Sequence, residues 1–174
     1  METWQIILII TLGLLAVFLL MGWFGYAQVV KNETLLLKRL KDLDKYEIDR
    51  GKKVLEVVSI MERNGYKKDK ETYRVISQGV EKMSELNMDE RSRYKNMVDM
   101  FSFILGRIHF EDKKFGKFIS EEDAIAFKQY HLEADEKYKE YNKAAMRYNV
   151  YLTSLFTKFF FFLRREKKVT AIVF

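Results

Sequence analysis

The chain has two histidines, and imidazole is a side chain often used for acid–base catalysis and for metal binding. His131 precedes Asp135 by four residues, a spacing that places both on one helix face as a candidate acid–base or metal-binding pair. Carboxylate-bridged di-iron bundles place a glutamate three residues before a histidine, but neither His131 nor His109 follows one at that distance. Because His131 also falls on an apolar helical stripe, we expect a hydrogen-bonded core histidine.

Other catalytic patterns are absent from the sequence. It has no cysteine, which excludes disulfides, thiolate metal sites and a thiol nucleophile, and which fits a reducing compartment. It also has no glycine-rich phosphate-binding loop. We therefore predict no catalytic activity and no cofactor. An enzyme that uses a histidine–carboxylate site in a helical core is the alternative.

The elements that position these residues are predicted to be helices. The 174 residues include no proline, which suits long uninterrupted helices. Alternating steps of three and four residues after Ser120 trace a stripe without lysine, arginine or carboxylate: Ala124, Phe127, His131, Ala134, Tyr138, Tyr141, Ala145, Tyr148, Leu152, Leu155, Phe159 and Phe162. This periodicity is typical of a bundle or coiled-coil seam. An unbroken helix from Ser120 to Leu163 would span about 65 Å.

Three helices are predicted before this one. The first ends at Asn64–Gly65, which tolerate left-handed backbone geometry. In its middle the apolar spacing lands on Glu47 and Arg50, next to Gly51, so we expect a weak segment with a local bend. The second starts after an N-cap and the third opens with a capping box, formed by Asp69 and by Asn87 with Glu90.

The N-terminal segment contains no charged residue from Thr3 to Val30. The run Ile6–Phe24 has about the 20 residues that a helix needs to cross a bilayer, and it includes Leu12 and Leu19. Trp4 and Trp23 lie at its two ends, as in the aromatic belts of membrane interfaces. We therefore predict a single-pass transmembrane helix, with the lipid bilayer as a partner of the chain.

Basic residues predict the orientation of this helix. None precedes it, whereas Lys31, Lys38 and Arg39 follow closely, so the positive-inside rule places the N-terminus outside and the C-terminal domain in the cytoplasm. Gly25–Ala27 offers a small-x-small cleavage pattern, and a secreted bundle cut after Ala27 is an alternative. A retained anchor is favoured because no basic residue precedes the apolar run, which exceeds a signal-peptide core in length.

These features predict an all-α chain in which a transmembrane helix precedes an antiparallel bundle of about four long helices. Residues 1–30 would form the anchor, residues 31–163 the bundle and residues 164–174 a basic and then apolar tail. All 31 basic residues follow residue 30, mostly interspersed with acidic ones, as on solvated helix faces. No recognition motif supports nucleic-acid binding.

The dipeptide Tyr-Asn occurs twice in the last helix, with a spacing of seven residues. Seven residues are two turns, so Tyr141 and Tyr148 occupy one seam position, where their rings fill the core and their hydroxyls need partners at its margin. Asn142 and Asn149 lie one step around the helix. There an amide can bond a neighbouring helix or its backbone.

This motif carries a family resemblance. With the N-terminal span and the helical domain, the chain resembles the LemA family at Tyr141, Asn142, Ala144, Tyr148 and Asn149. Lys45–Ile48 is similar to the family's Arg-Tyr-Asp-Leu in the first long helix. Residues 49–51 depart from the Ile-Pro-Asn-Leu that usually follows, which indicates a divergent member. The resemblance implies a helical fold anchored in a bacterial cell membrane, in a family with no agreed activity.

The C-terminal residues suggest a second membrane contact. If successive helices alternate in direction, the last one returns towards the inner leaflet. Its phenylalanines would suit the acyl boundary and its basic residues the anionic headgroups: Phe159, Phe160, Phe161, Phe162, Arg164, Arg165, Lys167 and Lys168. The alternative is that the phenylalanines cap the bundle core.

The function predicted from these patterns is that of a membrane-anchored cytosolic bundle, a scaffold or interaction module that binds an unidentified protein partner. The sequence specifies neither this partner nor the oligomeric state.

Overall fold

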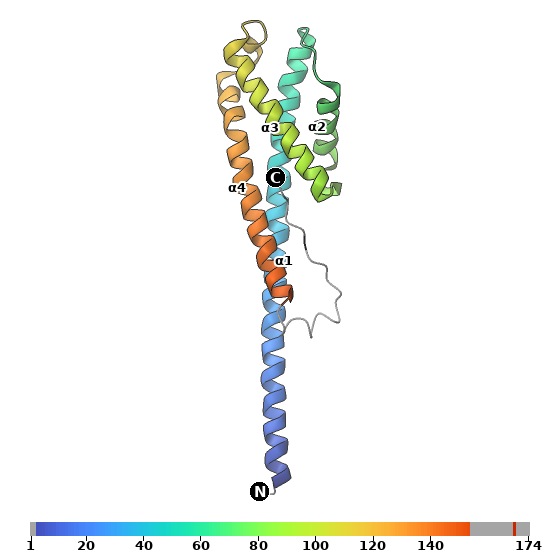
Figure 1. Cartoon of the computed structure of the whole chain (residues 1–174), viewed down its shortest axis with the longest axis vertical. Helices are drawn as coiled ribbons and strands as arrows, with labels where there is room; N and C mark the ends of the chain where they lie inside the picture. Colours follow the sequence, from blue (N-terminus) through green and yellow to red (C-terminus); the bar gives the residue numbers. More distant parts are fainter. Residues whose placement is uncertain (1–2, 154–168, 170–174) are drawn as a thin grey trace. The chain divides into compact units, whose positions relative to one another are not determined.

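The structure is a computed structural model that describes residues 3–153 and 169. These residues form four α-helices, α1 (Thr3–Arg63), α2 (Lys70–Lys82), α3 (Met88–Glu111) and α4 (Glu121–Thr153) (Figure 1). Two short 3-10 helices, η1 (Met83–Glu85) and η2 (Gly116–Phe118), follow α2 and α3. No strand occurs among the residues described, and the prediction of an all-helical chain is confirmed.

The predicted end of α1 is confirmed in its backbone geometry. Gly65 has φ 90°, in the left-handed region that favours glycine. Its amide donates to the carbonyl of Glu62 at 2.9 Å, and the amide of Tyr66 donates to the carbonyl of Met61 at 3.1 Å. This pair of hydrogen bonds is a Schellman motif, which satisfies carbonyls that the last helical turn leaves without partners.

The starts of the later helices are also those that the sequence predicts. Asp69 caps α2 by accepting a hydrogen bond from the amide of Thr72 at 3.2 Å. Asn87 and Glu90 form a reciprocal capping box, with bonds of 2.8 and 3.0 Å. The Ser120 hydroxyl accepts from the third amide beyond it, at 3.0 Å, and so begins α4.

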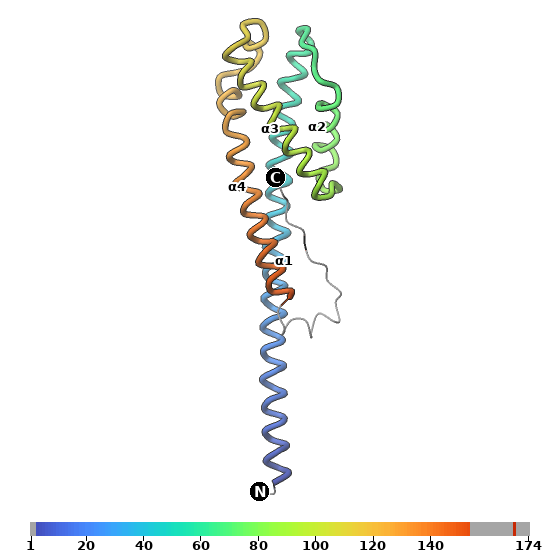
Figure 2. Tube along the Cα trace, viewed as in Figure 1, coloured from blue at the N-terminus to red at the C-terminus, as the bar shows by residue number. Residues whose placement is uncertain are grey.

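The chain divides into two compact units, and both α1 and α4 contribute to each. We call residues 39–142 the core unit. We call the described residues of the other, 3–38, 143–153 and 169, the terminal unit. The path of the chain through them can be followed in Figure 2.

One apolar cluster fills the core unit, and all four helices contribute to it. Its buried members are Val54, Val57, Val58, Met61, Ile76, Met83, Tyr94, Val98, Phe101, Leu105, Ile119, Ala124 and Phe127. In α1 and α4 the buried apolar residues recur every three or four positions. This spacing puts them on one face of a helix, and that face packs against the common core.

The stripe predicted on α4 is correct at most described positions and wrong at one. The residues of this stripe from Ala124 to Leu152 are buried apart from His131, which is exposed. Its place is taken by Tyr130, whose ring packs edge-on against Phe127 with centroids 5.6 Å apart. Phe127 and Ala134 face the core seven residues apart. Because a helix has 3.6 residues per turn, either residue 130 or residue 131 can face the core between them. Leu155, Phe159 and Phe162 lie outside the described residues.

In the terminal unit, the first half of α1 is apolar and exposed. It contains a segment long and apolar enough to cross a membrane, with mean hydropathy 2.7 and 6% of its residues buried. Trp4 is 58% exposed and Trp23 71% exposed, and Ile6, Leu12 and Leu19 are exposed between them. A helix with the length and composition of a membrane span is therefore present.

Candidate functional site

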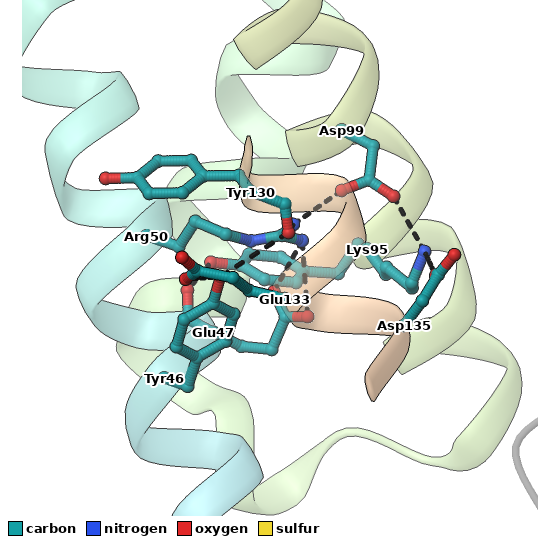
Figure 3. A network of polar contacts seen from close by, with 9 residues as sticks. Tyr46, Glu47, Arg50, Lys95, Asp99, Tyr130, Glu133 and Asp135 are labelled. Carbon is teal, nitrogen blue, oxygen red and sulfur yellow. Dashed lines mark hydrogen bonds and ion pairs between the residues drawn. The ribbon is translucent and has the colours of Figure 1, made fainter. Parts of the chain in front are cut away.

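Charged side chains gather in the interior of the core unit, between α1, α3 and α4 (Figure 3). We call this group the charge cluster: Glu47, Arg50, Lys95, Asp99 and Asp135. The side chains of Arg50 and Glu47 are 0% and 1% exposed. Buried charges are rare in proteins unless they are paired, so the contacts of this cluster decide what it can do.

Arg50 is the centre of the cluster and contacts all three helices. Its Nη2 donates to both carboxylate oxygens of Glu47, at 2.9 and 3.2 Å, within α1. Its Nη1 donates to Oδ1 of Asp99 on α3 at 2.5 Å and to the carbonyl oxygen of Tyr130 on α4 at 3.1 Å. The planar guanidinium, with donors in fixed directions, suits such a junction better than an ammonium group.

Lys95 extends the cluster towards the surface. Its ammonium lies 2.7 Å from Oδ2 of Asp99 and 2.8 Å from Oδ1 of Asp135 on α4. Asp99 therefore bridges two cations, and charges of opposite sign alternate from Glu47 through Arg50 to Asp135. Every charge in this series has an opposite neighbour, which offsets the cost of removing it from water.

Tyrosine rings surround the two cations. The Cζ of Arg50 lies 5.8 Å from the ring centroid of Tyr46 and 6.0 Å from that of Tyr130. The Nζ of Lys95 lies 5.7 Å from the ring centroid of Tyr138. These separations are within reach of cation–π attraction, which is strongest where water is excluded. The hydroxyl of Tyr46 points outward and donates to the carboxylate of Glu133 at 2.9 Å.

Tyr94 lies beside the cluster and is the reason that glycine is required at two positions. Its hydroxyl donates to the backbone carbonyl of Glu47 at 2.7 Å. A Cβ on Gly51 would overlap the hydroxyl of Tyr94, and a Cβ on Gly79 would overlap its ring. Only glycine leaves room for the tyrosine at these two places. Helix α1 runs through Gly51 without interruption, so this glycine accommodates a close approach within a continuous helix.

Burial governs the protonation of the groups in the cluster. Desolvation raises the pKa of the Glu47 carboxyl, although Arg50 and a hydrogen bond from Tyr138 act in the opposite direction. For Arg50, burial alone would lower the pKa, but the attraction of Glu47 and Asp99 outweighs it and the net pKa is raised. Burial likewise raises the pKa values of Tyr94 and Tyr138 far above the ordinary range.

This arrangement joins three helices through their side chains. The tyrosine hydroxyls stay protonated, and the guanidinium stays charged. A cavity of about 320 Å³ between α1 and α4 is lined by Tyr46, Lys137 and Glu140 among others, but by no member of the charge cluster. The side chains of the cluster bind one another, and these contacts hold α1, α3 and α4 together.

For the candidate histidine–carboxylate pair, the expectation of a core histidine is wrong, because His131 is exposed. The carboxylate of Asp135 binds Lys95, which is the main cause of the lowered pKa of Asp135, and His131 makes a smaller contribution in the same direction. His109 lies in the last turn of α3, and its Nδ1 is 2.8 Å from the carbonyl oxygen of Ile119. Among the described residues, no group of three or more histidines and carboxylates is placed to hold a metal ion.

The Tyr-Asn motif is placed as its spacing predicts, with one exception. Tyr141 and Tyr148 are buried, and so is Ala144. The hydroxyl of Tyr141 has no hydrogen-bond partner in the structure, contrary to the expectation that it reaches one at the margin of the core. Asn149 does bond a backbone: its amide nitrogen donates to the carbonyl of Val169 at 2.8 Å, and its oxygen accepts from the Val169 amide at 3.0 Å.

The chain matches no protein-family model, no curated protein and no solved structure. The resemblance to the LemA family therefore rests on the sequence motifs alone. The residues predicted to contact the membrane surface lie outside the described residues: Phe159, Phe160, Phe161, Phe162, Arg164, Arg165, Lys167 and Lys168.

Sequence reasoning missed the charge cluster, although a signal for it was present. Glu47 and Arg50 occupy positions where the α1 stripe calls for apolar side chains, three residues apart. We interpreted them as a weak point of the helix. Charges on an inward face instead indicate opposite charges on a neighbouring inward face, and on α3 these are Lys95 and Asp99, four residues apart.

Proposed function

We propose that this chain is a single-pass membrane protein whose antiparallel helical bundle faces the cytoplasm and acts through protein contacts, without catalysis. The observation that carries the proposal is the contrast within α1. Its first half is apolar and exposed, and its second half contains the buried ion pair of Glu47 and Arg50. In this proposal, one continuous helix connects the membrane anchor to the helical bundle.

The exposed half of α1 supports the membrane anchor on physical grounds. Large apolar patches on soluble monomers measure a few hundred Å², far less than a helix that is apolar on all sides over about 20 residues. In a bilayer this surface is solvated by acyl chains, and the helix satisfies its own backbone hydrogen bonds. The basic residues begin at Lys31, directly after the apolar half, which favours a cytoplasmic bundle.

The surface of the core unit supports a protein partner. Large apolar side chains are exposed on α3, where Met100, Phe103 and Phe110 lie at spacings of three and seven residues. Ile125 and Leu132 are exposed on α4. Aromatic residues and methionine are enriched in protein–protein interfaces, and charged residues are depleted at their centres. We therefore place the partner surface on these faces of α3 and α4.

Relationship to the LemA family is part of the same proposal. It is supported by the burial of Tyr141, Ala144 and Tyr148 and by the backbone clamp that Asn149 forms, because these are motif positions with definite structural roles. A shared way of packing the last helix is what a divergent member would keep.

Topology is the decisive test. The native chain has no cysteine, so the variants Glu2→Cys and Lys67→Cys carry single thiols. Lys67 is exposed in the α1–α2 loop, so a label there leaves the core intact. In intact cells, a membrane-impermeant maleimide should label only position 2, and both after lysis. Labelling of position 67 in intact cells would overturn the cytoplasmic bundle, and recovery of unlabelled chain in the soluble fraction would overturn the anchor.

The partner surface has its own test. A photo-crosslinking residue at Phe103 should give one dominant protein adduct in cells, whereas the same residue at Gln78, an exposed position of α2, should not. Equal adducts from both positions would remove the assignment of the α3 face.

A further inference from the structure

A cavity in the terminal unit lies directly beyond the apolar half of α1. Its volume is about 640 Å³, within the range of small-molecule sites, and residues of α1 and α4 line it. The lining residues are Gln28, Lys31, Asn32, Thr34, Leu35, Lys38, Arg147 and Tyr151. We call this cavity the basic pocket.

The charged residues given for the basic pocket are all cations. Of the described residues that line it, Lys31, Lys38 and Arg147 are charged and none is a carboxylate. Within the part of the chain that the structure describes, none of these three cations takes part in an ion pair. The buried cations Arg50 and Lys95, by contrast, each contact carboxylates of the chain. An anion held between α1 and α4 would supply the countercharge that the pocket lacks.

The spacing of the lining residues explains how the pocket forms. Gln28, Lys31, Leu35 and Lys38 follow one another at three and four residues, so they lie on one face of α1. Arg147 and Tyr151 lie one turn apart on α4. The half-buried Leu35 and the ring of Tyr151 give the pocket an apolar wall beside its cations.

The expected depth of the basic pocket in the membrane indicates which kind of anion it could bind. Lys31 lies five residues beyond Tyr26, which is about 8 Å along the helix, and this is the depth of phospholipid headgroups if Trp23 and Tyr26 lie at the interface. Guanidinium and ammonium groups are the usual protein ligands of phosphate. A headgroup phosphate, with its glycerol against the apolar wall, matches both the charge and the mixed lining.

We propose that the basic pocket binds the phosphate headgroup of an anionic phospholipid, held by Lys31, Lys38 and Arg147. This inference rests on the proposed membrane anchor. The three cations that carry the inference are described residues, and none of them belongs to the C-terminal segment for which the sequence predicts a membrane-surface contact. Bound lipid would link α1 to α4 where the chain leaves the bilayer.

The test uses the full-length chain reconstituted in phosphatidylcholine nanodiscs that contain a minor fraction of phosphatidylglycerol. Native mass spectrometry after release into detergent counts the phosphatidylglycerol that each chain retains. The test variant carries Lys31→Gln, Lys38→Gln and Arg147→Gln. A matched control carries Lys41→Gln, Lys52→Gln and Lys143→Gln, which are exposed on the same two helices outside the pocket and change the net charge equally.

Wild type and control should retain phosphatidylglycerol in preference to phosphatidylcholine. Affinity should fall about fivefold for each pocket cation removed, and it should weaken as salt increases. Equal retention by the test variant and the control would overturn the pocket. Competition by free glycerol 3-phosphate at concentrations similar to those of the lipid would assign the site to a soluble phosphate and overturn the lipid ligand.

A separate flotation experiment with vesicles of phosphatidylcholine alone tests the membrane anchor. If full-length protein does not float with these vesicles, the proposed membrane function fails. If it floats but the pocket variant retains as much anionic lipid as the control, the headgroup inference alone fails.

Discussion

Each half of α1 contains residues that invert the usual relation between polarity and burial. The apolar half is exposed, with Leu14 at 67% and Leu20 at 69%, whereas Glu47 and Arg50 in the charged half are almost completely buried. The same backbone hydrogen bonds continue through both halves. The backbone is therefore helical in both halves whatever the burial of their side chains. The surroundings of each half determine which side chains are tolerated there.

The inversion shows which surroundings each half requires. Exposed leucines in water lose the free energy of burial, about 25 cal/mol for each Å² of apolar surface, and a lipid environment restores it. Buried charges lose their hydration, and only close partners such as Asp99 offset that loss. Under the proposed membrane anchoring, the first half depends on lipid as its solvent, whereas the second half depends on partners within the chain.

The largest effect is expected from removing the central cation of the cluster. Arg50→Met leaves Glu47 and Asp99 without their shared partner, so the unfolding free energy should fall by about 3–5 kcal/mol. Urea unfolding of the full-length chain in mild detergent, followed by the near-ultraviolet circular dichroism of its buried tyrosines, measures this loss. Arg93→Met is the matched control because Arg93 and Glu71 form an exposed ion pair, and about 0.5 kcal/mol or less is expected there.

A triple substitution distinguishes two effects: the loss of a partner from buried charges, and the loss of the buried charges themselves. Glu47→Leu, Arg50→Met and Asp99→Leu remove Arg50 together with its two carboxylate partners and leave Lys95 paired with Asp135. Apolar replacements of buried ion pairs are often neutral or stabilising. We expect the triple variant to be more stable than Arg50→Met alone. A triple variant even less stable than Arg50→Met would mean that the cluster contributes more than mutual compensation of its charges.

The second effect concerns the two glycines beside Tyr94. Gly51→Ala and Gly79→Ala should each cost about 1–3 kcal/mol, because each methyl group overlaps the tyrosine. Tyr94→Phe removes the hydroxyl that Gly51→Ala meets but keeps the ring that Gly79→Ala meets. In double-mutant cycles by the same unfolding measurement, Tyr94→Phe should therefore rescue part of the first substitution and none of the second. Equal coupling in both cycles would contradict this geometry.

The sequence predicted elements better than it predicted contacts. Caps such as Asn87 with Glu90, and the stop at Gly65, are determined by a few neighbouring residues, so they could be read locally. The charge cluster joins residues about 50 and 80 positions apart, which no local pattern encodes. The exposure of His131 was missed for a related reason, because the neighbouring Tyr130 occupies the inward position beside Arg50.

A third prediction concerns pH. Because burial raises the pKa of Glu47, the folded chain binds this proton more tightly than the unfolded chain, whose glutamate has its ordinary value of 4.5. The stability that Glu47 contributes is therefore complete below about pH 4.5 and is lost as pH rises through its folded pKa. Each unit of difference between the folded and unfolded pKa corresponds to about 1.4 kcal/mol.

Glu47→Gln has no proton to lose at this position, so its stability relative to wild type should increase as pH rises above 4.5. Urea unfolding at a series of pH values tests the sign. Asp135→Asn is the control of opposite sign, because Lys95 lowers the pKa of Asp135 and its contribution is lost as pH falls. A constant difference between Glu47→Gln and wild type at all pH values would contradict the assigned direction.

The smallest effect is expected in the exposed half of α1, and it tests the comparison most directly. Leu14→Ala and Leu43→Ala are the same substitution in the same helix, but Leu14 is 67% exposed and Leu43 is 1% exposed. Leu43→Ala should lower the unfolding free energy by about 2–5 kcal/mol, because it leaves a cavity. Leu14→Ala should change it by about 0.5 kcal/mol or less, because Leu14 is largely exposed and its truncation leaves no cavity. A loss above about 2 kcal/mol at Leu14 would mean that the apolar half packs against protein, and the argument for lipid as its solvent would then fail.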